Sequence, residues 1–173
     1  MRKGRFKTSE LTLLAMLTAI LFVQETLLSS IPNIQFSVLL IMVYAATLGI
    51  PKAMLVMTVH VLLDNIIWGS LNPLTACPMW LGWFILILIG FALRKTPLPA
   101  IVAGSVLGSI IYCLCFALFN YLFMDINIIA YLTADIIFEI LMCCSSVVTV
   151  MFLYRPAEKL INMYYSKYVN KEE

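Results

Sequence analysis

Residues 98–122 read LPAIVAGSVLGSIIYCLCFALFNYL and contain no Asp, Glu, Lys or Arg. A helix of about 20 apolar residues crosses the roughly 30 Å hydrocarbon core of a bilayer, so this stretch predicts a transmembrane helix. Five further apolar runs cover 11–29, 34–49, 53–68, 79–93 and 126–154. The second, third and fourth runs in chain order are short, and the last is long. We therefore predict an all-α integral membrane protein with six transmembrane helices.

The composition agrees with this prediction. Apolar residues make up 63% of the 173 residues, charged residues 12%, and the mean hydropathy is +1.02. One water-soluble core cannot bury that much apolar surface. A basic segment precedes the first run, as in a secretory signal, but the run is longer than a signal's apolar region and lacks a small-residue cleavage site. We expect the first run to remain as a span.

The seven prolines are predicted to mark the boundaries of the spans, because proline cannot donate a backbone hydrogen bond inside a helix. Residues 1–173 are thus expected to form a single transmembrane domain with tight connections. Residues 155–173 interleave apolar and aromatic residues with Lys, which is typical of a short helix at a membrane surface. We predict that they form a cytoplasmic juxtamembrane tail. The prolines are Pro32, Pro51, Pro73, Pro78, Pro97, Pro99 and Pro156.

The eleven Lys and Arg residues give the orientation. If the chain crosses the membrane six times, all eleven Lys and Arg residues lie on the same side of it. The loops on the other side, at 30–35, 69–78 and 122–127, contain no Lys or Arg. Lys and Arg in short loops mark the cytoplasmic side. We predict a multi-pass protein of the cell membrane with both termini cytoplasmic. The basic residues are Arg2, Lys3, Arg5, Lys7, Lys52, Arg94, Lys95, Arg155, Lys159, Lys167 and Lys171.

Enzymatic motifs are missing from the sequence. It has no His-Glu-x-x-His zinc helix, no Gly-x-Ser-x-Gly turn and no phosphate-binding loop of the ATPase type. The five cysteines form no Cys-x-x-Cys pair, and four of them lie inside predicted spans, where free Cys packs as a small apolar residue. We expect neither an enzyme nor a resident cofactor, metal or nucleic-acid partner.

Small residues recur at helical spacing in two spans. Ala15 and Ala19 lie four residues apart, on one face of the first span, where small side chains let another helix approach closely. Gly104 and Gly108 form a similar pair, for which we expect packing inside the chain. Taken alone, the alanine pair is also compatible with ordinary packing between membrane helices.

With its basic N-terminus, Ala15/Ala19 in the first of six short spans and fewer than 200 residues, the chain resembles the substrate-binding S component of an energy-coupling factor (ECF) vitamin transporter. The resemblance implies that Ala15 and Ala19 contact a transmembrane coupling subunit, and that two cytosolic ATPases supply the ATP chemistry. It also implies transport by toppling of the S component within the bilayer. The stretch 31–36, Asp64-Asn65 and the Trp-rich fourth span are similar to S components without an assigned substrate.

Acidic residues dominate the half opposite the basic residues. Ionisable groups inside a membrane are costly unless they face a partner, water or a ligand. His60 can pair with one of these acids but not with all, and Asp135 and Glu139 share one helix face. The surplus favours a ligand that is positively charged or rich in N–H donors. The acids are Glu25, Asp64, Asp125, Asp135 and Glu139.

Amides and aromatic rings occur in the same half. Tryptophans at a membrane interface often serve as anchors, but rings beside amides also suit a planar heterocycle. We predict that the substrate-binding residues are Asn33, Gln35, Asp64, Asn65, Trp68, Asn72, Trp80, Trp83, Asn120, Tyr121, Asp135 and Glu139.

The expected function is capture of a micronutrient outside the cell. A queuosine precursor or a thiamin-like compound fits the acid surplus best, and cobalamin is the next candidate. Two other functions stay open. A self-sufficient secondary transporter could use Asp135 and Glu139 as a proton site, although no internal repeat is visible. An intramembrane enzyme would have only His60 and Asp64 as a candidate pair.

Overall fold

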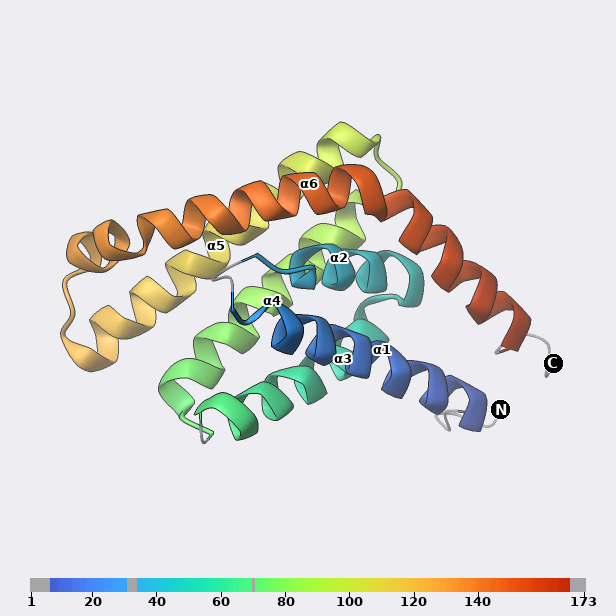
Figure 1. The fold of residues 1–173 in the computed structure, drawn as a ribbon, viewed down its shortest axis with the longest axis horizontal. Helices are drawn as coiled ribbons and strands as arrows, with labels where there is room; N and C mark the ends of the chain where they lie inside the picture. The colour runs from blue at the N-terminus through green and yellow to red at the C-terminus, as the bar shows by residue number, and fades with distance from the viewer. Residues whose placement is uncertain (1–6, 31–33, 70, 169–173) are drawn as a thin grey trace.

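The computed structural model describes residues 7–30, 34–69 and 71–168, and within them the secondary structure is helical throughout (Figure 1). This confirms the predicted all-α class. A π-helical turn, η1 (Asn65–Gly69), extends α3, and five of the helices are long and apolar enough to cross a membrane. The six α-helices of these residues are α1 (Thr8–Leu28), α2 (Ser37–Leu48), α3 (Ile50–Asp64), α4 (Pro73–Leu93), α5 (Leu98–Met124) and α6 (Ile128–Tyr168).

The helix too short to cross a bilayer alone is α2, whose twelve residues give a length of about 18 Å. It lies at the centre of the bundle, and nine of its twelve residues are buried. An apolar character on all sides is typical of such an enclosed helix. The neighbouring helix α4 comes close because Gly90 lacks a side chain: a Cβ there would lie 2.9 Å from Met42 Cα. The Tyr44 hydroxyl donates to the Leu17 carbonyl of α1 at 3.1 Å.

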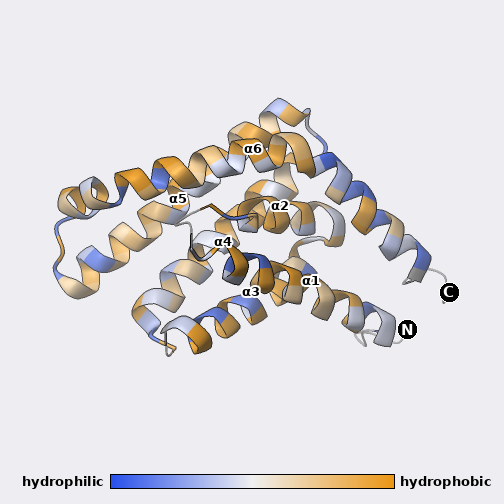
Figure 2. Ribbon diagram, viewed as in Figure 1, coloured by the Kyte–Doolittle hydropathy of each residue, from blue (hydrophilic) through white to orange (hydrophobic). Residues whose placement is uncertain are grey.

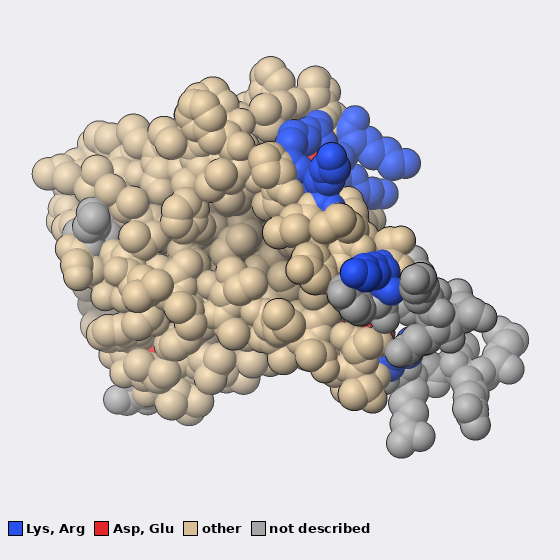
Figure 3. Space-filling model, turned by 45° about the vertical axis from the view of Figure 1, so that its right-hand side comes forward, with Lys and Arg blue, Asp and Glu red and all other residues tan. Residues whose placement is uncertain are grey.

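Charge is segregated along the bundle. Figure 3 shows the visible Lys and Arg side chains gathered at one end, which we call the basic end. Most of the helical surface is apolar, and hydrophilic colour appears along the last part of α6 and in parts of α1 and α3 (Figure 2). Arg2, Lys3, Arg5 and Lys171 lie outside the described residues. The described members of the basic end are Lys7, Lys52, Arg94, Lys95, Arg155, Lys159 and Lys167.

The prediction that every proline marks a boundary is wrong for Pro78 and Pro156, which lie inside α4 and α6. A proline within a helix removes one backbone hydrogen bond and bends the axis. The long α6 accordingly bends toward its C-terminal end (Figure 1). Pro51, Pro73, Pro97 and Pro99 do lie at helix starts. Pro32 is outside the described residues.

The C-terminal segment is also not a separate short helix. It continues α6 to Tyr168 and packs back on the bundle, where Ile161 is buried. Lys52 Nζ lies 2.5 Å from Glu10 Oε1, and the Tyr165 hydroxyl donates to the same oxygen at 3.1 Å. Lys52 also contacts the Tyr165 hydroxyl. We call Glu10, Lys52 and Tyr165 the latch, because they join α1, α3 and α6.

Replacing Lys52 by Met is expected to weaken the latch. Glu10, whose side chain is 10% exposed, would lose its cation, and the loss of a charged hydrogen bond costs about 1.5–3 kcal/mol. We expect a lower melting temperature in detergent and faster tryptic cleavage of the end of α6. Lys95→Met, at an exposed position, serves as the control. Equal melting temperatures for the two variants would show that the latch contributes no stability.

Candidate ligand site opposite the basic end

Polar side chains from α1, α2 and α3 meet inside the bundle, in the half opposite the basic end. Glu25 lies near the end of α1, and its Oε2 is 3.1 Å from His60 Nε2 of α3. The Ser37 hydroxyl of α2 donates to the same Glu25 oxygen at 3.3 Å. Asp64 lies one turn beyond His60. We call Glu25, Ser37, His60 and Asp64 the polar cluster.

Gln24 fixes the cluster to the connection between α1 and α2. Its Nε2 donates to Ser37 Oγ at 2.7 Å, and its Oε1 accepts the backbone N–H of Phe36 at 2.8 Å. The connection is also tied to α6, because Ser145 Oγ accepts the N–H of Gln35 and donates to its carbonyl. These bonds hold the end of α1 against α2 and α6, and so they position Glu25.

His60 is incompletely satisfied. Its side chain is 0% exposed, yet among the described residues neither ring nitrogen has an aligned hydrogen-bond partner. Glu25 Oε2 approaches His60 Nε2 to 3.1 Å without good hydrogen-bond geometry. Asp64 is half-buried, and within the described chain it makes no hydrogen bond or ion pair. It lies one turn from His60 on the same face of α3. Unpaired buried polar groups are rare and mark sites where a ligand or water completes the bonding.

Aromatic rings lie beside His60 and between α4 and α5. The ring centroid of Phe22 on α1 is 6.5 Å from that of His60. Trp83 of α4 is fully buried, and its ring centroid lies 4.3 Å from that of Tyr112 on α5. Within the described residues, Trp83 Nε1 has no hydrogen-bond partner. Phe22 is therefore the ring that the structure places against the polar cluster, whereas Trp83 and Tyr112 join α4 to α5.

Asp135 and Glu139 face α5, as their shared helix face allows. Cys113 Sγ donates to Asp135 Oδ2 at 3.2 Å, and Cys143 Sγ donates to Glu139 Oε1 at 3.1 Å. In the described parts of the chain, no three His, Cys, Asp or Glu side chains come together as metal ligands would.

The three predicted amides from other connections have local structural roles. Asn65 is buried and bonds to the Val61 carbonyl, Met79 and Thr75. Asn72 caps α4 by accepting the N–H of Leu74. Asn120 donates to the Phe116 carbonyl. These bonds stabilise helix ends and turns, so the three amides are less available to a ligand than the polar cluster is.

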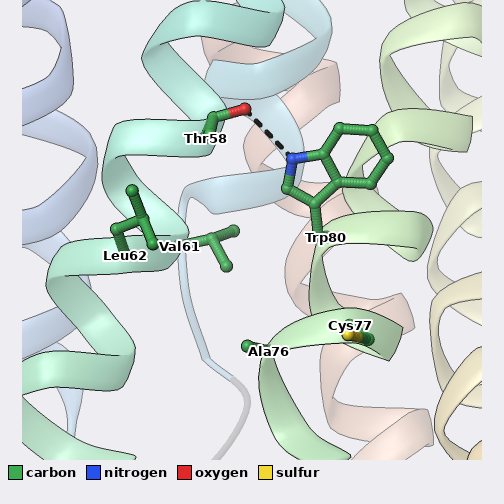
Figure 4. Close-up of a pocket in the computed structure, with 6 residues that line it drawn as sticks. All are labelled: Thr58, Val61, Leu62, Ala76, Cys77 and Trp80. Atoms are coloured by element: carbon green, nitrogen blue, oxygen red, sulfur yellow. Dashed lines mark hydrogen bonds between the residues drawn. The ribbon is translucent and has the colours of Figure 1, made fainter. Parts of the chain in front are cut away.

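The predicted aromatic residues are scattered. Trp68 and Tyr121 are exposed at 60% and 50%. Trp80 donates through Nε1 to Thr58 at 3.0 Å and lines an apolar pocket of about 270 Å³ between α3 and α4 (Figure 4). Leu62, in the same pocket, is 48% exposed, so the pocket opens on the outside of the bundle. Asn33 is outside the described residues.

Of the predicted residues, the structure thus places Asp64 in the polar cluster with Glu25, Ser37 and His60, whereas Trp83 lies in the core against Tyr112. Ser37 was missed by sequence reasoning. Glu25 was recognised as an acid but not placed in the site. The adjacent polar pair Gln24-Glu25 near the end of an apolar span is the signal that could have identified it.

A second surface lies on α1. Ala15 and Ala19 are exposed, whereas Leu14, Leu17 and Leu21 face the core. Next to this face, an apolar groove of about 340 Å³ runs between α1, α2 and α6 and includes Ile20. Only 22% of the α1 span is buried, so one side of this helix has no partner within the described chain.

No family model, curated protein or solved structure matches the chain.

Proposed function

We propose that the protein is the substrate-binding subunit of an ECF-type importer in the cell membrane. It would have six spans, with the basic end in the cytoplasm and both termini on that side. It would capture a micronutrient from outside and deliver it by associating with a transmembrane coupling subunit and two ATPases. The chain itself would perform no ATP chemistry.

The observation that carries the proposal is the exposed Ala15/Ala19 face of α1. An apolar helix that shows two small residues at i and i+4 offers a surface on which another membrane helix can pack closely. In this chain the core side of α1 is filled by leucines, so the alanines remain available to a second protein.

The opposite half supports a binding role. The polar cluster combines carboxylates, an unsatisfied imidazole and a neighbouring ring in the half that contains no described Lys or Arg. A heterocycle with positive charge or several N–H donors is the ligand class that this set complements. Queuosine precursors and thiamin-like compounds belong to this class and are favoured over cobalamin.

Co-purification tests the proposal. The tagged full-length chain, extracted in mild detergent from its native membrane, is expected to retain a coupling subunit and two ATPase subunits that mass spectrometry identifies. The Ala19→Trp variant should lose them. Recovery of the chain alone at every detergent strength, although ligand binding is intact, would contradict the proposed role.

A further inference from the structure

The unsatisfied state of His60 indicates a missing partner. A neutral imidazole has one donor and one acceptor nitrogen, and burying either without a hydrogen bond is costly. Both nitrogens of His60 lack such a bond within the described residues, and the side chain is 0% exposed. Glu25 lies 3.1 Å from Nε2 but is not aligned for a hydrogen bond.

The groups around His60 are acidic. Glu25 lies 3.1 Å from His60 and Asp64 one turn along α3, and the described Lys and Arg residues lie at the far end of the bundle. Carboxyl groups inside a membrane are costly unless a partner or ligand satisfies them. A ligand with one positive charge would remove this cost, whereas an anion would increase it.

A neighbouring ring favours an organic cation. The Phe22 ring centroid lies 6.5 Å from that of His60. Aromatic rings attract organic cations through their faces and pack on heterocycles. A bare metal ion would need three or more oxygen, nitrogen or sulfur ligands in reach, which the described side chains do not provide as a group.

We propose that the polar cluster is the subsite for the positively charged nitrogen of a heterocyclic organic cation, on the premise that the chain is a binding subunit as proposed above. Glu25 and Asp64 receive the charged nitrogen, and His60 bonds to Glu25 or to the ligand. Phe22, beside His60, packs on the heterocycle. Asp135 and Glu139 accept hydrogen bonds from cysteine thiols. They contribute to the electrostatic field at the ligand but do not contact it.

The test uses the purified full-length chain and calorimetry with four probes. Thiamin and 7-aminomethyl-7-deazaguanine carry a positive charge, 7-cyano-7-deazaguanine has the same ring system without it, and biotin is anionic. We expect one or both cationic probes to bind. The cyano compound should bind at least about tenfold more weakly than its aminomethyl counterpart, because a charged hydrogen bond is lost. Biotin should not bind.

Variants locate the subsite. Asp64→Asn and Glu25→Gln preserve shape and are each expected to weaken binding of the cationic probe about tenfold or more. Asp125→Asn is the matched control, since Asp125 is an exposed acid in the α5–α6 connection with φ 52°, a conformation that Asn tolerates. It should change affinity by less than about twofold. Melting temperatures without probe establish that each variant is folded.

The subsite is refuted if neither cationic probe binds, if charged and uncharged deazaguanines bind equally, or if Asp64→Asn and Glu25→Gln bind like the wild type. Stabilisation by NaCl over KCl without any organic probe would also refute it, since the site would then hold a metal cation. None of these measurements requires the coupling subunit. If co-purification fails but the cationic probes bind as expected, the importer role is overturned and the subsite stands. If co-purification succeeds but the probes do not bind as expected, the subsite is overturned and the importer role stands.

Discussion

Replacing Ala15 or Ala19 by Trp is expected to abolish ATP-driven uptake while changing the ligand affinity of the isolated chain by less than about twofold. Close packing between membrane helices depends on small residues at the contact. An indole on this face would hold a partner helix away from α1. The transport complex would then not assemble, although the binding site, on the other side of the helix, would be unaffected.

The structure makes this substitution informative, because both alanines are exposed. Ala103→Trp is the matched control. Ala103 is also exposed, close to the basic end, but on α5. It should transport normally. Joint loss of binding and transport in Ala15→Trp or Ala19→Trp would instead assign the alanines a role in folding.

Replacing Trp83 by Ala is expected to lower the stability of the bundle by about 3–5 kcal/mol, the usual cost of deleting a large buried aromatic side chain. Trp83 is 0% exposed and lies against Tyr112. The substitution would leave a cavity between α4 and α5. Ligand binding should weaken together with stability.

Trp68→Ala provides the comparison. Trp68 is 60% exposed on η1, so its replacement should change stability by no more than about 0.5 kcal/mol. Thermal unfolding in detergent, followed by intrinsic fluorescence of the remaining tryptophans, measures both variants. If the two variants unfold at the same temperature, the assignment of Trp83 to the core is wrong.

The helices were predictable from sequence because membrane-spanning segments have a strong signal. Runs such as 98–122 are long and uncharged, and α5 (Leu98–Met124) matches that run closely. The one-sided distribution of Lys and Arg likewise predicted their gathering at one end. Helix interiors were less predictable. Pro78 and Pro156 were expected at boundaries but lie inside α4 and α6.

The candidate site was predicted only in part. A hydropathy pattern indicates how deep in the membrane a residue lies, but not which side of its helix faces the interior of the bundle. Trp80 and Trp83 are three residues apart in α4, yet one lines a pocket on the outside of the bundle and the other fills the core. Asn65, Asn72 and Asn120 were expected in the ligand-binding half, but their side chains already hydrogen-bond to nearby residues. The pairing of Glu25 with His60 depends on how α1 crosses α3, which no local pattern encodes.

Uptake in proteoliposomes tests the central claim most directly. Vesicles containing the chain together with its coupling subunit and two ATPases should accumulate a labelled cationic heterocycle only when ATP is present. Vesicles containing the chain alone should bind the compound without accumulating it. Accumulation by the chain alone, driven by an ion gradient without ATP, would contradict the account and identify a self-sufficient transporter.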